Sequence, residues 1–335
     1  HCGSRVSNKS RKNELTAIIG RRKFEEYPGG VTSSHDRTRW RRFRDRYNGA
    51  QELAPPRSFP LQIDFELNST CQMTCGFCTH GAERVPRREL SFDDFKRVMD
   101  EGAEYGLASI KLNYINEPLL NRSLLRFVDY AKARGVLNVY FATNGLLLSR
   151  EVARGLVASK VSKVMVSLDA VTPETFKVMR QSDQFEQIVR NIKNLIEVRE
   201  EAGVTYPFIR VNFLKTRLNE HEADRFIEYW EGVADMVGLQ DQVQLPGVDE
   251  ELLPERHARR DSFRCAFPFK LVVIDSGGDI LPCCTFSGRL MPLGNIDTMT
   301  VSQAWNSSAM RDLREIHYAG LYATNSICRH CVGGS

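Results

Sequence analysis

The sequence predicts an α/β protein with a mostly parallel sheet, followed by a small cysteine-rich module. Six strand-like segments alternate with amphipathic helical segments between residue 60 and about residue 246. Strands that alternate with helices pair in parallel, because each helix carries the chain back to the same end of the sheet. Five of the nine cysteines follow this region. No Gly-x-Gly-x-x-Gly follows the first strand, which argues against a dinucleotide-binding fold.

The strand candidates fall at regular intervals and are Leu61–Leu67, Ser109–Tyr114, Asn138–Thr143, Lys163–Leu168, Phe208–Leu214 and Gln242–Leu245. The first helix starts at Ser91, where Asp94 completes a capping box, and runs to about Tyr105. The other helix candidates are Leu124–Ala133, Glu151–Ser159, Pro173–Arg180, Phe185–Ala202 and Glu220–Met236. Parallel strands place a ligand site at their carboxyl ends.

The chain divides into three predicted regions: a basic arm over residues 1–57, the alternating region over 58–250 and a module over 251–335. Trp40, Phe43 and Tyr47 recur at helical spacing, so we expect the arm to pack on the core as a helix. The module predicts a hairpin, with strands Lys270–Ile274 and Asp279–Leu281, and a final helix near Val301–Tyr318.

Composition predicts a soluble globular protein. The chain has 335 residues, of which 42% are hydrophobic and 26% charged. No stretch approaches 18 consecutive apolar residues, which excludes a membrane span, and the first thirty residues show no signal sequence. We therefore expect a cytoplasmic protein. Residues 1–50 carry 13 Lys/Arg and 5 Asp/Glu, a charge of +8, but no nucleic-acid motif or stacking aromatics accompany them, so nucleic-acid binding is not expected.

Cysteine is the informative residue type. The nine cysteines are Cys2, Cys71, Cys75, Cys78, Cys265, Cys283, Cys284, Cys328 and Cys331. An odd and tightly clustered set is not how a disulfide framework is distributed, and it indicates metal binding. Cys71, Cys75 and Cys78 have C-x3-C-x2-C spacing in the loop after the first strand. Three thiolates there can hold three irons of a 4Fe–4S cluster; the alternative is zinc, with His80 as a fourth ligand.

This pattern resembles the radical S-adenosylmethionine (SAM) superfamily, whose members have a partial (β/α)6 TIM-like barrel. Phe77 precedes the third cysteine, and Asn116-Glu117-Pro118 follows the second strand where the family has Gly-Gly-Glu-Pro. Ile115-Asn116 replaces the two glycines. Further matching features at later strand ends are Asn144 in Thr143-Asn144-Gly145, Ser167 and Asp169, Arg180, and Arg210 with Asn212.

The resemblance implies a site for SAM. Glu117 and its neighbours would receive the methionine amino group, and Ser167, Asp169 and Arg180 the ribose and carboxylate. Arg210 and Asn212 would make a further SAM contact. The implied chemistry is one-electron reduction of SAM, which yields a 5′-deoxyadenosyl radical that abstracts hydrogen from a C–H bond. A flavodoxin- or ferredoxin-type protein would supply the electron.

The second group comprises Cys265, Cys283, Cys328 and Cys331, whose spacing alone fits a zinc ribbon or a second cluster. It resembles the SPASM extension in its shortened twitch form, which implies one auxiliary 4Fe–4S cluster with four protein ligands. Cys284 directly follows Cys283. It is either a small buried residue or, as in radical SAM epimerases, a hydrogen donor. Cys2 is expected to be a bystander.

The leading functional prediction is epimerisation of a sugar-containing natural product, with Cys284 as the hydrogen donor. Three alternatives remain: oxidation of an alcohol carbon, modification of a ribosomally made peptide, and a non-catalytic iron–sulfur or zinc-stapled binding protein. Glu66 and several histidines could bind substrate or move protons. The histidines lie on polar segments, so we expect them at the surface: His35, His221, His257, His317 and His330.

Overall fold

The computed structural model describes residues 16–20, 31–53, 58–82, 86–242, 250–252 and 263–332. In these residues a single sheet has the strand order β1-β7-β6-β5-β4-β3-β2-β8-β9-β10. The strands are β1 (Thr16–Gly20), β2 (Gln62–Phe65), β3 (Ser109–Lys111), β4 (Asn138–Thr143), β5 (Lys163–Ser167), β6 (Phe208–Lys215), β7 (Met236–Asp241), β8 (Leu271–Ile274), β9 (Asp279–Leu281) and β10 (Gly294–Asn295).

The central strands confirm the α/β prediction. β2 to β7 pair in parallel, each with the next along the chain. The barrel stays open, because β7 pairs with β1 and β2 pairs with β8 instead of with each other. The helices are α1 (Ser34–Gly49), α2 (Thr79–Ala82), α3 (Phe92–Glu104), α4 (Leu124–Ala133), α5 (Arg150–Ala158), α6 (Pro173–Arg180), α7 (Phe185–Glu201), α8 (Ala223–Trp230), α9 (Val301–Trp305), α10 (Ser308–Tyr318) and α11 (Ser326–Cys331).

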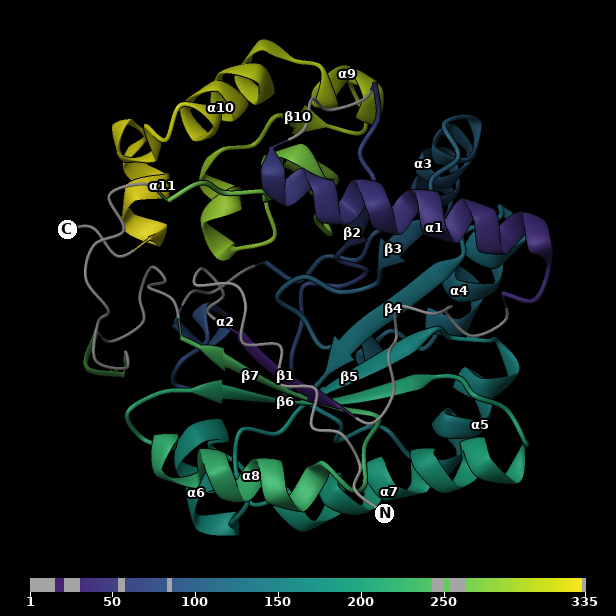
Figure 1. Cartoon of the computed structure of the whole chain (residues 1–335), viewed down its shortest axis with the longest axis vertical. Helices are drawn as coiled ribbons and strands as arrows, with labels where there is room; N and C mark the ends of the chain where they lie inside the picture. The colour runs from purple at the N-terminus through teal and green to yellow at the C-terminus, as the bar shows by residue number, and fades with distance from the viewer. Residues whose placement is uncertain are drawn as a thin grey trace.

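The core lies between the sheet and the helices of the alternating region, and Figure 1 shows α4, α5, α7 and α8 along the outside of the sheet. Alternate strand residues such as Ile63, Phe65 and Val164 are fully buried in this core with Phe95 of α3. The intervening strand residues therefore face the opposite side, which we call the inner face. The inner face is available for a ligand.

The predicted arm helix is confirmed as α1. Ser33 caps it by accepting a hydrogen bond from the backbone N–H of Asp36 at 3.0 Å. Trp40 and Phe43 are buried and pack with Ala108 and Leu137, the residues just before β3 and β4. The helix therefore covers the amino ends of the strands, opposite the expected ligand site.

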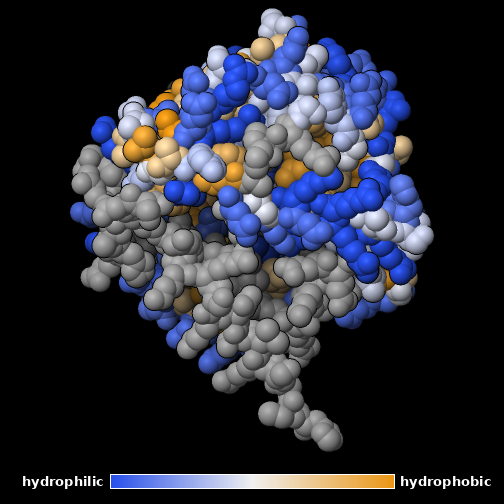
Figure 2. All heavy atoms as spheres, turned by 45° about the horizontal axis from the view of Figure 1, so that its top comes forward, coloured by the Kyte–Doolittle hydropathy of each residue, from blue (hydrophilic) through white to orange (hydrophobic). Residues whose placement is uncertain are grey.

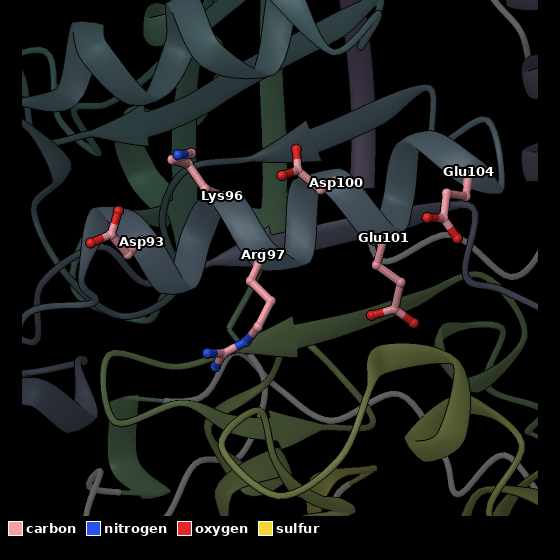
Figure 3. Close-up of a pocket in the computed structure, with 6 residues that line it drawn as sticks. All are labelled: Asp93, Lys96, Arg97, Asp100, Glu101 and Glu104. Atoms are coloured by element: carbon pink, nitrogen blue, oxygen red, sulfur yellow. The ribbon is translucent and has the colours of Figure 1, made fainter.

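The C-terminal hairpin is also confirmed, since β8 and β9 pair antiparallel, but its position was not foreseen. β8 pairs in parallel with β2 and continues the sheet. The module also contacts α3: Glu101 accepts hydrogen bonds from the backbone N–H groups of Val301 and Ser302 at 3.0 and 2.8 Å. Figure 3 shows Arg97 and Glu101 pointing from the polar groove of α3 toward this module.

Three predicted elements were wrong in detail. The predicted strand Gln242–Leu245 comes too late, because the strand is β7 at Met236–Asp241, and residues 243–249 lie outside the described residues. The preceding helix ends at Trp230, since Asp235 pairs with Arg199 of α7 and accepts a hydrogen bond from the backbone N–H of Ile209 of β6 at 2.8 Å. The single helix predicted near Val301–Tyr318 is two helices, with Ser307 capping the second.

None of the helices in the described ranges is long and apolar enough to cross a bilayer. The described surface in Figure 2 is largely hydrophilic, with hydrophobic side chains gathered in small patches. Several of the exposed large apolar residues belong to the C-terminal module: Leu290, Tyr318 and Leu321.

Candidate active site

The first cysteine group lies in the loop between β2 and α2. Cys75 is buried, while Cys71 and Cys78 are partly buried. The backbone N–H of Cys78 donates to the carbonyl of Cys75 at 3.1 Å, and the backbone N–H of Met73 lies 3.5 Å from the Cys71 sulfur. All three are free thiols. The loop therefore places three free thiols at the carboxyl end of the first parallel strand.

These thiols fit a cationic cluster. Burial, together with the charges of Glu117, Cys75 and Cys78, raises the pKa of Cys71 to about 11. Buried thiolates that repel one another need a metal to be stable in that form. Two donors lie near the sulfurs: Asn144 Nδ2 is 3.8 Å from Cys71 Sγ, and Arg180 Nη1 is 3.7 Å from Cys75 Sγ. Such donors tune a cluster's potential.

The described residues around the first cysteine group do not form a site for a single zinc ion. Tetrahedral zinc with bonds of about 2.3 Å holds its sulfurs about 3.8 Å apart. In the described part of the chain, no three His, Cys, Asp or Glu side chains are grouped tightly enough to hold a single metal ion. His80, the alternative fourth zinc ligand, places Nε2 3.0 Å from the carbonyl of Ser69. The C-x3-C-x2-C spacing of the loop fits three ligands of an iron–sulfur cluster, in which each cysteine binds a different iron.

The Glu117 side chain links the segment after β3 to the end of β4 by hydrogen bonds. Its carboxylate is 1% exposed and accepts hydrogen bonds from Thr143 Oγ1 and from the backbone N–H of Asn144, both at 2.7 Å. The backbone N–H of Leu119 donates to it at 3.0 Å, at the start of a short 3-10 helix that begins with the buried Pro118. A carboxylate has about four acceptor positions, so one remains for a ligand amine. Burial raises the pKa of this group.

Asn116 and Asn144 are held by other amides. Asn116 Nδ2 donates to Asn68 Oδ1 at 3.0 Å, and its Oδ1 accepts from the backbone N–H of Tyr114 at 2.9 Å. Asn144 Oδ1 accepts from Gln72 Nε2 at 3.2 Å. The Asn116 side chain, absent from the family's glycine pair, thus fastens this segment to the loop after β2. Sequence reasoning missed both Asn68 and Gln72.

Asp169, Arg180 and Phe77 form one buried group with the cysteine loop. Asp169 has a positive φ of 63° and pairs with Arg180 Nη2, while its Oδ1 accepts from the backbone N–H of Leu214 at 2.7 Å. The Arg180 guanidinium lies 5.1 Å from the centre of the Phe77 ring. Arg180 Nε is buried and has no hydrogen-bond partner among the described residues. An unpartnered buried N–H beside the cysteine loop fits an additional polar ligand.

Ser167, Asn212 and Arg210 lie on the inner face of neighbouring strands. Ser167 pairs in register with Asn212, which pairs with Gly238. Within the described residues, Asn212 Oδ1 and Arg210 Nε are buried without hydrogen-bond partners. A Cβ at Gly238 would overlap the Arg210 guanidinium, so the glycine makes room for that side chain. These unsatisfied groups are also consistent with a bound polar ligand.

The second cysteine group comes from three segments of the C-terminal module and consists of Cys265, Cys283, Cys328 and Cys331. The charge of Cys283 raises the pKa of each of the other three, after the larger effect of burial. Thr285 Oγ1 lies 3.4 Å from Cys283 Sγ. A Cβ at Gly288 would be 2.7 Å from the Cys283 carbonyl, so a glycine is required there. Four gathered thiols fit a fully protein-ligated cluster.

His317 corrects the expectation of surface histidines. It is 2% exposed, its Nδ1 lies 3.3 Å from the backbone N of Cys265, and its Nε2 lies 3.5 Å from Cys328 Sγ. Helical spacing could have revealed this, since His317 shares the buried face of α10 with Met310 and Leu313. His35, His221 and His330 are exposed, as expected, whereas His257 and Cys2 lie outside the described residues.

Cys284 packs against residues of the sheet. It packs beside Tyr114, Leu271, Val273 and Leu281. Burial raises its pKa to about 12, and the largest charge effect on it comes from Asp64 of β2, ahead of both Lys111 and Cys283. The thiol is partly exposed. Its position is therefore close to the inner face of the sheet.

Two family models match the parts of the chain that contain the two cysteine groups. The family model described as the Radical SAM superfamily matches residues 65–213, and the SPASM model, described as an iron–sulfur cluster-binding domain, matches residues 265–332. The chain carries a radical SAM domain followed by a SPASM domain. The cofactors of this radical SAM enzyme are SAM and two 4Fe–4S clusters.

The curated relatives of this radical SAM chain match about half of it. A probable GTP 3′,8-cyclase from Saccharolobus solfataricus is 33% identical over 170 residues, 50% of this chain and 53% of the relative. The mycofactocin maturase MftC from Mycolicibacterium smegmatis is 32% identical over 171 residues, 50% of this chain and 41% of MftC. The chain thus spans about half the length of these relatives or less.

Solved structures share the fold over more of the chain. BtrN in complex with AdoMet and 2-DOIA has a TM-score of 0.56 at 19% identity, covering 83% of this chain and 94% of BtrN. Streptococcus suis SuiB bound to S-adenosylmethionine has a TM-score of 0.56 at 15% identity, covering 91% of this chain and 80% of SuiB. These similarities confirm the open-barrel radical SAM fold with its C-terminal module.

Proposed function

We propose that this radical SAM enzyme epimerises a C–H centre of a sugar-containing small molecule, with Cys284 as the hydrogen donor. One observation carries the proposal. Among eight described cysteines, seven fall into the two ligand groups, and the eighth, Cys284, lies beside the inner face, where Asp64 and Lys111 are its strongest charged neighbours. A thiol in this place can reach a substrate held between the sheet and the C-terminal module.

We assign the cluster ligands from the two groups. Cys71, Cys75 and Cys78 would hold the SAM-binding cluster, and Cys265, Cys283, Cys328 and Cys331 the auxiliary one. Around the first cluster, Glu117 would accept a hydrogen bond from the SAM amino group with its remaining lone pair. Arg180 Nε and Asn212 Oδ1, both buried without partners in the described residues, would bind other polar groups of SAM. Phe77 supports the Arg180 guanidinium.

When bound, the cofactors supply one-electron cleavage of SAM and a 5′-deoxyadenosyl radical that takes a hydrogen atom from the substrate carbon. Cys284 then breaks its S–H bond, and the hydrogen atom forms a new C–H bond on the opposite face of that carbon. The sulfur is left one electron and one proton short. A flavodoxin- or ferredoxin-type donor would return the electron, and solvent reaching the partly exposed thiol would return the proton.

Solvent deuterium tests the role of Cys284. A thiol exchanges with solvent, so turnover in deuterated water should place one deuterium at the inverted carbon. Cys284→Ala should stop inversion while SAM cleavage continues with an unchanged iron content. Cys2→Ala, which removes the other cysteine outside the cluster groups, is the matched control and should behave as wild type. Inversion that persists in Cys284→Ala would overturn the assignment.

Oxidation of an alcohol carbon is the second candidate, and Asp64 favours it. Its carboxylate is 2% exposed, and burial raises its pKa, so it is a base suited to accept an alcohol proton. The auxiliary cluster would then take the second electron. An oxidised product without solvent deuterium would support this reaction over epimerisation.

Two other candidate functions have weaker support. SuiB was solved with its precursor peptide SuiA, which fits the expectation that this chain modifies a ribosomally made peptide, but nothing among the described residues favours a peptide over a small molecule. A non-catalytic iron–sulfur or zinc protein would not cleave SAM. Iron and zinc analysis, together with chromatography of 5′-deoxyadenosine, distinguishes such a protein from a radical SAM enzyme.

A further inference from the structure

His317 of α10 lies between two of the four cysteines of the second group. Its side chain is 2% exposed. Its Nδ1 lies 3.3 Å from the backbone nitrogen of Cys265, and its Nε2 lies 3.5 Å from the sulfur of Cys328. Both polar atoms of this buried ring therefore contact residues that are proposed to hold the auxiliary cluster.

The position of His317 is fixed by the packing of α10. The residue shares the buried face of this helix with Arg314. Arg314 Nε donates a hydrogen bond to the carbonyl of Pro268 at 2.8 Å. Pro268 stands shortly after Cys265 in the sequence, so the same helix face binds the segment that carries this cysteine. The imidazole therefore contacts Cys265 from a packed helix.

The contact with Cys265 determines which ring nitrogen of His317 carries the proton. The backbone N–H of Cys265 is a donor, so Nδ1 accepts this hydrogen bond and has no proton itself. A neutral imidazole then carries its proton on Nε2. The atom opposite Nε2 is the sulfur of Cys328, which can only accept when it is a thiolate. The two contacts together make Nε2–H a donor to Cys328 Sγ.

The same contact argues against His317 as a direct ligand of iron. A metal-bound imidazole almost always donates its other ring N–H to a carbonyl, a carboxylate or water. Here the other nitrogen, Nδ1, faces a donor, so a metal on Nε2 would leave the ring without any proton. Four cysteines also supply all the ligands that a 4Fe–4S cluster takes. The geometry therefore suits a residue that acts on a ligand.

We propose that His317 raises the reduction potential of the auxiliary cluster through a hydrogen bond from Nε2 to the Cys328 thiolate. Reduction adds negative charge to the cluster and to the sulfurs that bind it. A donor to one of these sulfurs stabilises the reduced form more than the oxidised form. His317 is thus a positioning residue that acts through Cys328. This inference rests on the ligand assignment in the proposed function and is independent of the reaction proposed there.

A potentiometric titration of the anaerobically reconstituted full chain, followed by electron paramagnetic resonance, measures this potential. The chain with all three cysteines of the first group replaced by Ala identifies the signal of the auxiliary cluster. His317→Phe keeps a ring and removes the N–H donor. The equilibrium constant for reduction of the auxiliary cluster should then fall about tenfold, which for one electron is a shift of about 59 mV to more negative potential.

Two further variants show whether the N–H group causes the shift. His317→Gln, whose amide can donate in place of Nε2, should recover most of the wild-type potential. His330→Phe is the matched control, because His330 is exposed and lies between Cys328 and Cys331 in α11. It should leave the potential unchanged. A wild-type potential in iron-loaded His317→Phe protein, or an equal shift in His330→Phe, would overturn the proposal.

Pulsed electron paramagnetic resonance of the wild-type chain, with its histidines labelled with nitrogen-15, tests the contact without a substitution at His317. A hydrogen bond to a cluster sulfur should give a weak nitrogen-15 coupling to the reduced auxiliary cluster, and this coupling should persist in His330→Phe. An imidazole bound to iron would give a much stronger coupling. Either a strong coupling or none at all would overturn the proposal.

Iron analysis and product analysis separate this inference from the proposed function. The double variant Cys328→Ala/Cys331→Ala should lower the iron content from about eight to about four per chain. An unchanged iron content would overturn the ligand assignment together with the inference that rests on it. Absence of an epimerised product, with the shift in His317→Phe as expected, would overturn the proposed reaction and leave the role of His317 standing.

Discussion

Arg289 donates hydrogen bonds from Nη2 to both carboxylate oxygens of Glu66, at 2.8 and 2.7 Å. Glu66 directly follows β2 and is 1% exposed, whereas Arg289 lies in the short 3-10 helix Phe286–Leu290 that follows Cys283 and Cys284. Ser276 Oγ donates to the same carboxylate at 2.8 Å. A buried ion pair therefore fastens the segment with the auxiliary-cluster ligand Cys283 to the first parallel strand. Glu66 was a candidate for substrate binding, but its acceptor positions are used within the protein.

Removing the Glu66 carboxylate should destabilise the protein. Glu66→Ala leaves a largely buried Arg289 without its partner, which typically costs about 3–5 kcal/mol of unfolding free energy. Urea denaturation of the reconstituted protein measures this loss of unfolding free energy. Glu197→Ala removes the exposed partner of Arg150 and should have a much smaller effect. Equal stability of the two variants would contradict a bridging role for Glu66.

Arg180→Lys should weaken SAM binding without loss of iron. The guanidinium pairs with Asp169, lies 3.7 Å from the Cys75 sulfur and lies over the Phe77 ring, and an ammonium cannot make all three contacts. We expect the Kd for SAM to rise about tenfold, equivalent to about 1.4 kcal/mol, in equilibrium binding to the reconstituted protein. Arg190→Lys on the exposed face of α7 is the control. Unchanged SAM affinity in Arg180→Lys would remove Arg180 from the proposed site.

Gly238→Ala should displace Arg210 with a moderate effect on folding. The added methyl group would overlap the end of the Arg210 side chain, which can move, so we expect a stability loss of about 1 kcal/mol. If Arg210 contacts SAM, the loss in free energy of SAM binding should be larger than the loss in free energy of unfolding. Gly49→Ala is the matched control, since a Cβ there meets nothing within 4 Å. Wild-type SAM affinity in Gly238→Ala would count against the Arg210 contact.

The local pattern predicted much of the fold. β4, α4 and α6 begin and end at the predicted residues, because their periodicity and flanking residues specify those ends locally. Both cysteine groups could also be found, since ligand spacing within one loop is visible in sequence. Pairing of β8 with β2 and of β1 with β7 could not, because pairing between segments far apart in sequence leaves no periodic signal in either one.

The same limit applies to the site. Glu66 and Arg289 are separated by 223 positions, and nothing in either segment marks the pairing. The pairing of Asp64 with Lys111 depends on strand register, which brings the two residues side by side only once the sheet is assembled. Spacing identified the candidate ligands, whereas the environment of Cys284 became clear from the structure alone.

Cleavage of SAM by the reconstituted protein tests the central claim most directly. Anaerobic protein with about eight irons, mixed with SAM and a strong reductant, should release 5′-deoxyadenosine and methionine. Cys71→Ala should abolish this release, and Cys284→Ala should retain it, because Cys284 acts after the cleavage. No 5′-deoxyadenosine from the iron-loaded protein, or release that persists in Cys71→Ala, would contradict the account.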